Sequence, residues 1–242
     1  VLANIRLWSR FRPCDDSIKN MTFLFFSSSS KNSSLENVLL NSIKMDQNSM
    51  MCFKNVLVSF ANLPESKNDH LIGSRLMFEQ MLSKNIFYGK TEPHHVFYME
   101  PDCVPVRPNW LNVVEASTAH QDFWMKGSIF RGDSKTFSSD LIYNHIHING
   151  NAIYNVKDQE FKEFYFGIVR KLITSRLGEE GGYDADIFKV LLWKNAKFTS
   201  CYFHKFIFSD FVINMWHTPF SINQILAENK NVVLIHGGQA LQ

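Results

Sequence analysis

Three short apolar segments, separated by stretches of helical periodicity, constrain the fold more than any other feature of this chain. They cover residues 22–26 (TFLFF), 56–61 (VLVSFA) and 95–99 (HVFYM). Each has the length of a strand and is apolar enough to be buried on both faces, as the strands of parallel sheets are. Helices predicted over residues 35–43 and 73–83 connect them. This order predicts an α/β fold whose parallel sheet has helices on both faces.

The second half of the chain is less regular. Strands predicted over residues 122–130 and 147–154 flank a polar loop, and a strong amphipathic helix is predicted over 159–177. A glycine turn and a helix follow over 181–193, and a last strand over 231–238. Because the sequence contains no internal repeat and no linker, we expect a single domain over residues 1–242. Ser33 or Ser34 is the expected cap of the first helix.

Composition and charge exclude several classes of protein. Hydrophobic residues make up 45% and charged residues 20% of the chain, as in average globular proteins. The net charge of +2 is too small to indicate nucleic acid as the main partner. No apolar run approaches the ~18 residues of a membrane span. Residues 1–12 contain three arginines and no apolar core, so they do not resemble a signal peptide.

The four cysteines are far apart in the sequence and form no C-x-x-C pair. They are Cys14, Cys52, Cys103 and Cys201. This spacing predicts reduced, mostly buried thiols rather than a zinc site or a set of disulfides. We therefore expect a cytoplasmic protein, or one of the secretory lumen if an N-terminal anchor has been removed.

Polar residues follow the predicted strands at their carboxyl ends, where ligands bind in sheets of this kind. Ser27 and Ser28 follow the first strand, and Asn62 follows the second. They could bind a nucleotide through hydroxyls and amides, or form an ordinary polar loop. Arg75, on the second helix, could contact a phosphate or be a solvated surface charge.

The third strand ends in Glu100-Pro101-Asp102, which places two carboxylates two residues apart. Pro101 holds the backbone extended between them. Mg²⁺ and Mn²⁺ favour one or two carboxylates together with phosphate oxygens and water. The segment therefore indicates either a site for a divalent cation or a strand end with solvated acids.

Three later segments add groups that could act with these carboxylates. Asp184 follows a glycine turn at a predicted helix N-terminus, where it could be a general base or a helix cap. His236 ends the last strand and could bind a metal ion or lie at the surface. Asn149 and Gly150 belong to a turn, Asn149-Gly150-Asn151, that offers amides near the same cleft.

Taken in order, these segments resemble the GT-A glycosyltransferases. That family has an acid-x-acid motif after a central strand, then a glycine-bearing loop, an acidic catalytic segment and a C-terminal metal-binding histidine. The matching residues are Glu100 to Asp102, Asn149 to Asn151, Asp184 and His236. The segment GGYDADIF at 181–188 is similar to GGEDDDIF of the inverting β-1,4-galactosyltransferases, with Tyr183 in place of a glutamate.

The resemblance implies a GT-A fold, with a Rossmann-like, mainly parallel central sheet and a smaller sheet on the acceptor side. It implies a nucleotide-binding half at about 20–105 and an acceptor half at about 106–242. Asp102 and His236 would bind Mn²⁺ or Mg²⁺, Glu100 would contact the ribose or a metal-bound water, and Asp184 would be the catalytic base. The activity implied is inverting transfer from a UDP-sugar to an oligosaccharide or glycoprotein acceptor.

In its Phe-, Asn- and Lys-rich composition the chain also resembles glycosyltransferases of large algal viruses. That resemblance implies a xylose, galactose or rhamnose donor and a viral protein of the host cytoplasm. Two alternatives remain at this stage: a non-catalytic module that binds nucleotide sugars or glycans, and a phosphate-transferring enzyme. The sequence contains no P-loop or kinase-type motif, which argues against the phosphate-transferring enzyme.

Overall fold

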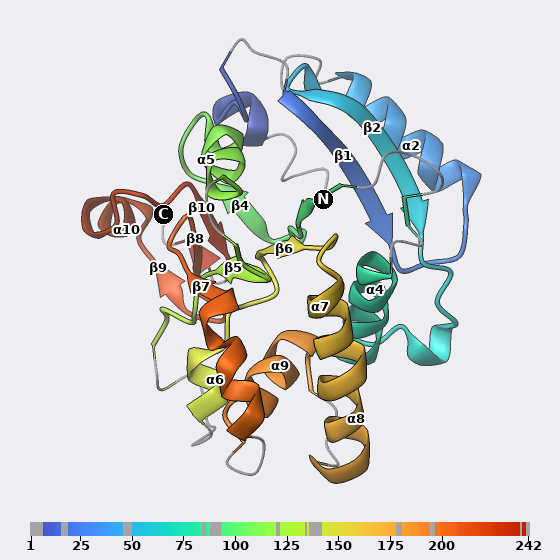
Figure 1. Ribbon diagram of the computed structural model, residues 1–242. Coiled ribbons are helices and arrows are strands. Elements are labelled where there is room, and N and C mark those ends of the chain that lie inside the picture. The colour runs from blue at the N-terminus through green and yellow to red at the C-terminus, as the bar shows by residue number, and fades with distance from the viewer. Residues whose placement is uncertain are drawn as a thin grey trace.

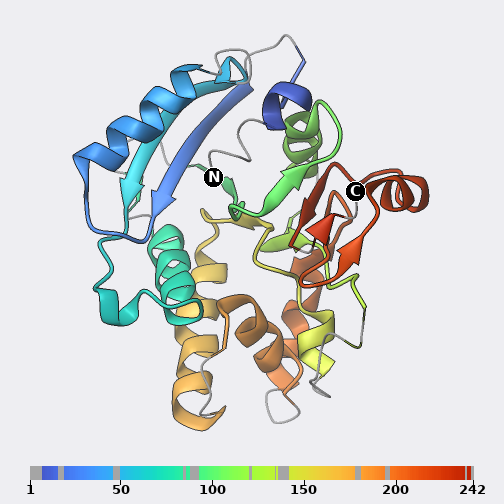
Figure 2. The same cartoon turned by 180° about the vertical axis from the view of Figure 1, so that it is seen from behind.

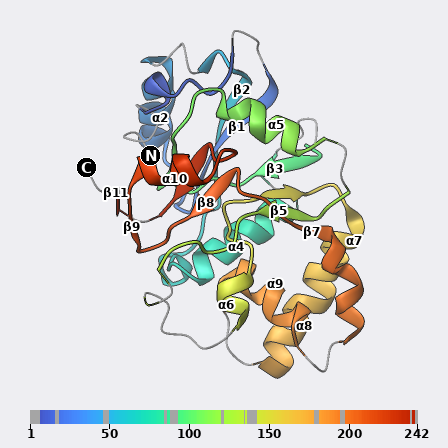
Figure 3. The same ribbon diagram turned by 90° about the vertical axis from the view of Figure 1, so that its left-hand side faces the viewer.

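The elements lie in three tiers in a computed structural model, with two long strands at one end, short strands in the middle and a group of helices at the other end (Figure 1). Figure 2 shows the same tiers from behind, and Figure 3 shows them from the side. The structure describes residues 7–15, 19–45, 50–83, 86–87, 93–119, 122–133, 135, 142–177, 181–193, 197–237 and 239–240. These residues form both helices and strands, so the fold is mixed α/β, as the sequence predicts.

The first tier consists of two parallel strands and the helix that joins them. β1 (Lys19–Ser27) pairs with β2 (Phe53–Phe60), and α2 (Ser33–Met45) lies along one side of the pair (Figure 1). Both strands and the helix agree with the sequence prediction. The prediction that Ser33 or Ser34 caps this helix is wrong. The Asn32 side-chain oxygen is the cap, since it accepts hydrogen bonds from the N–H groups of Ser34 and Leu35 at 2.9 and 3.1 Å.

The prediction that the third strand continues this parallel sheet is wrong for the strands that the structure describes. β3 (His95–Phe97) instead pairs antiparallel with β6 (Ile153–Asn155). These two strands belong to a four-stranded sheet in the order β3-β6-β5-β7, with β5 (Met125–Gly127) and β7 (Phe206–Phe208). β5 is antiparallel to β6 and parallel to β7. Strand order along the chain does not fix pairing, since partners come from distant segments.

A three-stranded sheet positions the candidate site. Its order is β4-β10-β8, with β4 (Cys103–Pro105), β10 (Leu234–His236) and β8 (Val212–Asn214). β10 is antiparallel to β4 and parallel to β8, so His236 lies opposite Cys103 and beside Asn214. β9 (Pro219–Phe220) and β11 (Gln239–Ala240) form a separate parallel pair.

The helices at the far end pack around buried aromatic residues. The predicted helix over 159–177 is confirmed, and much of it has the wider turns of a π-helix. Its consecutive parts are α7 (Gln159–Lys162), η3 (Glu163–Val169), α8 (Arg170–Leu172) and η4 (Ile173–Leu177). Further helices of the described chain, at this end and elsewhere in the molecule, are η1 (Glu65–Lys67), α4 (Ile72–Leu82), α5 (Trp110–Ser117), α6 (Ile142–Ile146), α9 (Tyr183–Leu191), η5 (Lys197–Lys205) and α10 (Ile222–Glu228). Phe78 stacks on Tyr183 with 4.1 Å between ring centroids, which fixes α4 against α9.

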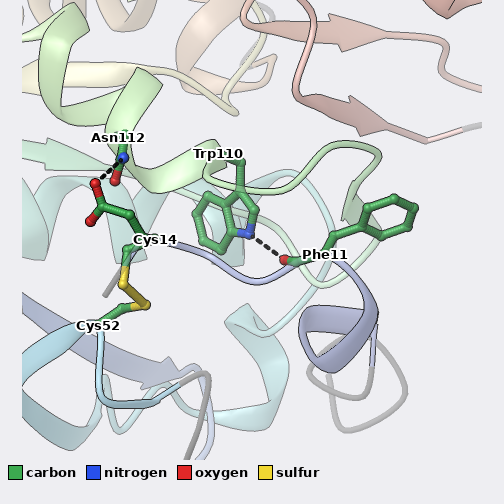
Figure 4. The surroundings of a disulfide bond; sticks show 6 residues. Phe11, Cys14, Cys52, Trp110 and Asn112 are labelled. Atoms are coloured by element: carbon green, nitrogen blue, oxygen red, sulfur yellow. Dashed lines mark hydrogen bonds between the residues drawn. A yellow bond between two sulfur atoms is a disulfide. The ribbon is translucent and has the colours of Figure 1, made fainter. Parts of the chain in front are cut away.

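A disulfide joins the N-terminal segment to the start of β2. Cys14 is bonded to Cys52, 38 residues away, so the prediction of four reduced thiols is wrong (Figure 4). The same N-terminal segment contacts α5, where Trp110 Nε1 donates a hydrogen bond to the Phe11 carbonyl at 3.2 Å. Sequence spacing could not reveal this bond, because folding alone brings the two cysteines together. Cys103, which is buried, and Cys201, which is exposed, form no disulfide.

Within the described part of the chain, no helix has both the length and the apolar character that a membrane crossing requires.

Candidate functional site

Two sheets bring Glu100, Asp102 and His236 together. Glu100 and Asp102 lie in the turn between β3 and β4, where the Cys103 N–H donates to the Glu100 carbonyl at 3.0 Å. His236 ends β10, the strand paired with β4. The pairing of these short strands therefore decides the site, although 134 residues separate Asp102 from His236.

The three side chains present ligand atoms to one point. His236 Nε2 is 2.9 Å from a Glu100 carboxylate oxygen and 3.4 Å from an Asp102 oxygen. All three ligand atoms lie within 4.8 Å of one another. The His236 side chain is only 4% exposed, whereas that of Asp102 is 59% exposed, so the group is open to solvent on the aspartate side.

Asn214 orients the His236 imidazole. Its side-chain oxygen accepts a hydrogen bond from the Trp216 N–H at 3.1 Å, which identifies that atom as the acceptor. His236 Nδ1 lies 3.2 Å from the same oxygen and therefore donates its proton to it. This leaves Nε2 facing the carboxylates, the orientation that outer hydrogen bonds give to metal-binding histidines.

The charges of the trio strongly affect its titration. Burial alone would lower the pKa of His236, but hydrogen bonds and charge attraction from Asp102 and Glu100 raise this pKa to about 9. The pKa of Asp102 is lowered, chiefly by its hydrogen bond with His236. The imidazolium thus supplies a positive charge between two carboxylates, at the place where a metal ion would lie.

Asn151 holds Glu100 in place through two hydrogen bonds. Its side-chain oxygen accepts from the Glu100 N–H at 2.7 Å, and its side-chain nitrogen donates to the Glu100 carboxylate at 2.7 Å. Asn151 is 1% exposed, and its backbone and side chain both donate to the side-chain oxygen of Asn149. The predicted turn at 149–151 therefore supports one carboxylate of the trio.

The same turn also holds Asp184. One Asp184 oxygen accepts the Gly150 N–H at 2.8 Å, and the other accepts the Ala185 N–H at 2.9 Å. Asp184 lies in the first turn of α9. His147 lies with Nε2 3.7 Å from an Asp184 carboxylate oxygen.

The Gly150 peptide is fixed from its other side by two tyrosines. Tyr154 donates its hydroxyl to the Gly150 carbonyl at 3.0 Å, and Tyr183 does so at 3.4 Å. Burial raises the pKa of both phenols well above the ordinary value, so both remain donors. A side chain at residue 150 would meet the Tyr183 hydroxyl at 2.5 Å, which explains the glycine.

The polar residues after β1 and β2 bind each other. The carbonyl of Ser27 accepts the Ala61 N–H at 2.7 Å, and that of Ser28 accepts the Leu63 N–H at 2.9 Å. Asn62 has a left-handed backbone, with φ 52°, and its side chain accepts the Lys31 N–H at 2.8 Å. The structure therefore brings the predicted Ser27, Ser28 and Asn62 to one edge. Their contact with a nucleotide stays a prediction.

Arg75 lies in a buried cluster of charges. Its Nε is 3.7 Å from Glu79, which Arg170 also approaches to 3.1 Å. Arg170 also forms an ion pair with Asp186, with 3.5 Å between a guanidinium nitrogen and a carboxylate oxygen. Burial raises the pKa of Asp186 to about 6. The cluster joins α4, α8 and α9, which indicates a structural role, and contact of Arg75 with a phosphate stays a prediction.

The trio fits a hard divalent cation. Carboxylate oxygens suit Mg²⁺ and Mn²⁺, and an imidazole nitrogen adds a ligand that suits Mn²⁺ more than Mg²⁺. The structure includes Glu100 among the potential ligands, beside the predicted Asp102 and His236. Sequence reasoning missed Asn214 and His147, because no motif surrounds either of them.

Neither the models of known protein families nor the curated protein sequences match this chain.

Proposed function

We propose that the chain is a metal-dependent, inverting glycosyltransferase of the GT-A type, which transfers a sugar from a UDP-sugar to a hydroxyl group of a glycan. The observation that carries this proposal is the turn at 149–151, which supports both halves of the site. Asn151 holds Glu100 of the cation trio, and the Gly150 N–H holds Asp184. A cation site beside a positioned carboxylate is the arrangement that such a transfer requires.

The trio would bind the cation together with the donor diphosphate. Glu100, Asp102 and His236 supply two carboxylates and one imidazole, which leaves coordination positions for phosphate oxygens. Bound Mn²⁺ or Mg²⁺ would neutralise charge that develops on the departing diphosphate. Ser27, Ser28 and Asn62 are the proposed contacts of the uridine.

Asp184 would act as general base towards the acceptor hydroxyl. Two backbone N–H groups hold its carboxylate in place, and its side chain is 15% exposed. A base that activates an attacking hydroxyl leads to direct displacement and therefore to inversion. General-base assistance of this kind contributes about 10²–10⁴ in rate.

A non-catalytic module that binds nucleotide sugars is the second candidate. It would need the cation trio, but it would have no use for an Asp184 carboxylate held in position beside it. The donor we propose carries xylose, galactose or rhamnose. Since disulfides persist in oxidising compartments, the Cys14–Cys52 bond favours the secretory lumen over the cytoplasm as the place of action.

Thermal-shift measurements with UDP, GDP and CMP, each with and without Mn²⁺, test the proposal. We expect UDP to stabilise the protein only when Mn²⁺ is present, and Asp102→Ala to abolish that effect. UDP release from one UDP-sugar would then identify the donor. If none of the nucleotides stabilises the protein, the chain is not a nucleotide-sugar transferase.

A further inference from the structure

A groove lies at the opposite end of the strand that carries His236. It has a volume of about 760 Å³ and lies among the start of α5, the segment between β7 and β8, and the segment before β10. Val233 lines it, three residues before His236. Multiplied by the rise per residue of a β-strand, this offset of three residues separates the groove from the cation trio by about 10 Å. Its size is in the range of small-molecule sites.

Two cations that have no carboxylate partner among the described residues line this groove. Arg107 is half-buried, and its one hydrogen bond in the described structure goes to the Leu226 carbonyl at 3.2 Å, while its Nε is buried without a partner. Lys230 is exposed and forms no ion pair with any residue that the structure describes. Asp210 also lines the groove, but Arg131 binds it at 2.9 Å. The groove therefore has a net positive charge.

This charge favours an anionic ligand. A partly buried guanidinium is normally paired with a carboxylate or another acceptor, because desolvation disfavours an isolated charge. The described part of the chain supplies no carboxylate for Arg107. The groove is thus electrostatically opposite to the trio at the other end of β10, which has two carboxylates.

The neutral groups of the groove suit a ligand with many hydroxyls. Asn112 contributes an amide, and Ser117 and Ser209 contribute hydroxyls, so the lining both donates and accepts hydrogen bonds. Phe208 lines the groove with 54% of its surface exposed, which offers an aromatic face to the apolar side of a sugar ring. A bare phosphate or sulfate ion would use the cations alone.

We propose that this groove binds an acidic saccharide, with Arg107 and Lys230 bound to its carboxylate and Phe208 stacked on a ring. The site goes beyond the proposed transferase activity, because it needs neither the cation trio nor Asp184. If the chain is a transferase, the groove would hold a charged part of a glycan away from the reacting hydroxyl.

Isothermal titration of the whole chain with a trimer of galacturonic acid tests this site. The matching galactose trimer and inorganic sulfate are the comparison ligands, each measured at low and at high ionic strength. Lys230→Glu and Phe208→Ser are the test variants. Lys54→Glu, an exposed lysine on β2, is the matched control for the charge change.

We expect the acidic trimer to bind more tightly than either comparison ligand, and to bind more weakly at high ionic strength. Lys230→Glu should weaken binding by about tenfold or more, because an attraction becomes a repulsion. Phe208→Ser should also weaken it, and Lys54→Glu should not.

Four results would each overturn the proposal. They are no binding of the acidic trimer, equally tight binding of the neutral trimer, an unchanged affinity of Lys230→Glu for the acidic trimer, and binding of sulfate as tightly as the trimer, which would show a simple anion site. The UDP and Mn²⁺ thermal shift of Lys230→Glu reports on the transferase separately. A variant that loses the trimer but keeps that shift supports both proposals.

Discussion

The charge of His236 predicts how the affinity of the trio for a cation depends on pH. Asp102 and Glu100 raise the pKa of His236 to about 9 against the effect of burial. An imidazole must be neutral to bind a metal ion, so a cation has to displace the Nε2 proton. At pH 7, two units below this pKa, only about 1 molecule in 100 is neutral. The apparent affinity for Mn²⁺ should then be about 100-fold weaker than above pH 9, a cost of about 2.7 kcal/mol.

Calorimetric titration with Mn²⁺ between pH 6 and 8 measures this effect. We expect the affinity to increase roughly tenfold per pH unit, with about one proton released per cation, as repeats in buffers of different ionisation enthalpy would show. Asp102 should not add to the slope, since its lowered pKa keeps it ionised over this range. His236→Asn should bind more weakly and lose most of the pH dependence.

The metal-free protein provides a second measurement of the same charge. A group whose pKa is raised by folding stabilises the protein below its unfolded pKa, here 6.5, and loses that contribution as pH rises through about 9. Stability measured by urea unfolding without metal should therefore fall between these values. If Mn²⁺ affinity is independent of pH and no proton is released, His236 is either neutral or not a ligand, and the reasoning fails.

Three further substitutions test other parts of the structure. Asp184→Asn should leave Mn²⁺ and UDP binding intact while turnover falls by about 10²–10⁴, and normal turnover would remove Asp184 as the base. Gly150→Ala should cost about 1–3 kcal/mol of stability and also reduce turnover, because its methyl group would meet the Tyr183 hydroxyl at 2.5 Å; wild-type values in urea unfolding and turnover assays would contradict this. Cys14→Ser should lose up to about 4 kcal/mol in chemical unfolding, because it opens a loop closed over 38 residues. Cys201→Ser is its control, and equal stability of the two variants would count against the disulfide.

The sequence by itself determined the local elements where apolar patterning was strong. β1, β2, α2, α4 and the long helix over 159–177 lie where periodicity predicts them, because side-chain spacing along one segment reflects which faces are buried. The predicted strands over 122–130 and 147–154 shrink to three residues each, β5 and β6. Residues 142–146, which belong to the predicted polar loop, form the short helix α6. Short apolar runs do not distinguish strand from other buried structure.

The acid-x-acid segment, Asp184 and His236 were also predicted as candidate site residues from the sequence, since strand ends and helix starts mark where polar groups can gather. The resemblance further predicted that Asp102 and His236 bind one cation, but not the contacts that hold the site together. The pairing of β4 with β10 places His236 beside Asp102, and the turn at 149–151 connects Glu100 to Asp184. Asn214 and His147 had no recognisable signal because their importance lies entirely in what they contact.

Only the tertiary structure decided which strands pair, that Cys14 meets Cys52, and that Arg107 lacks a carboxylate partner among the described residues. These features join residues far apart in the chain, and many sequence patterns are compatible with several such pairings. Periodicity records the burial of one segment, whereas a site depends on distances of a few ångströms between segments. Those distances are fixed when the segments pack together.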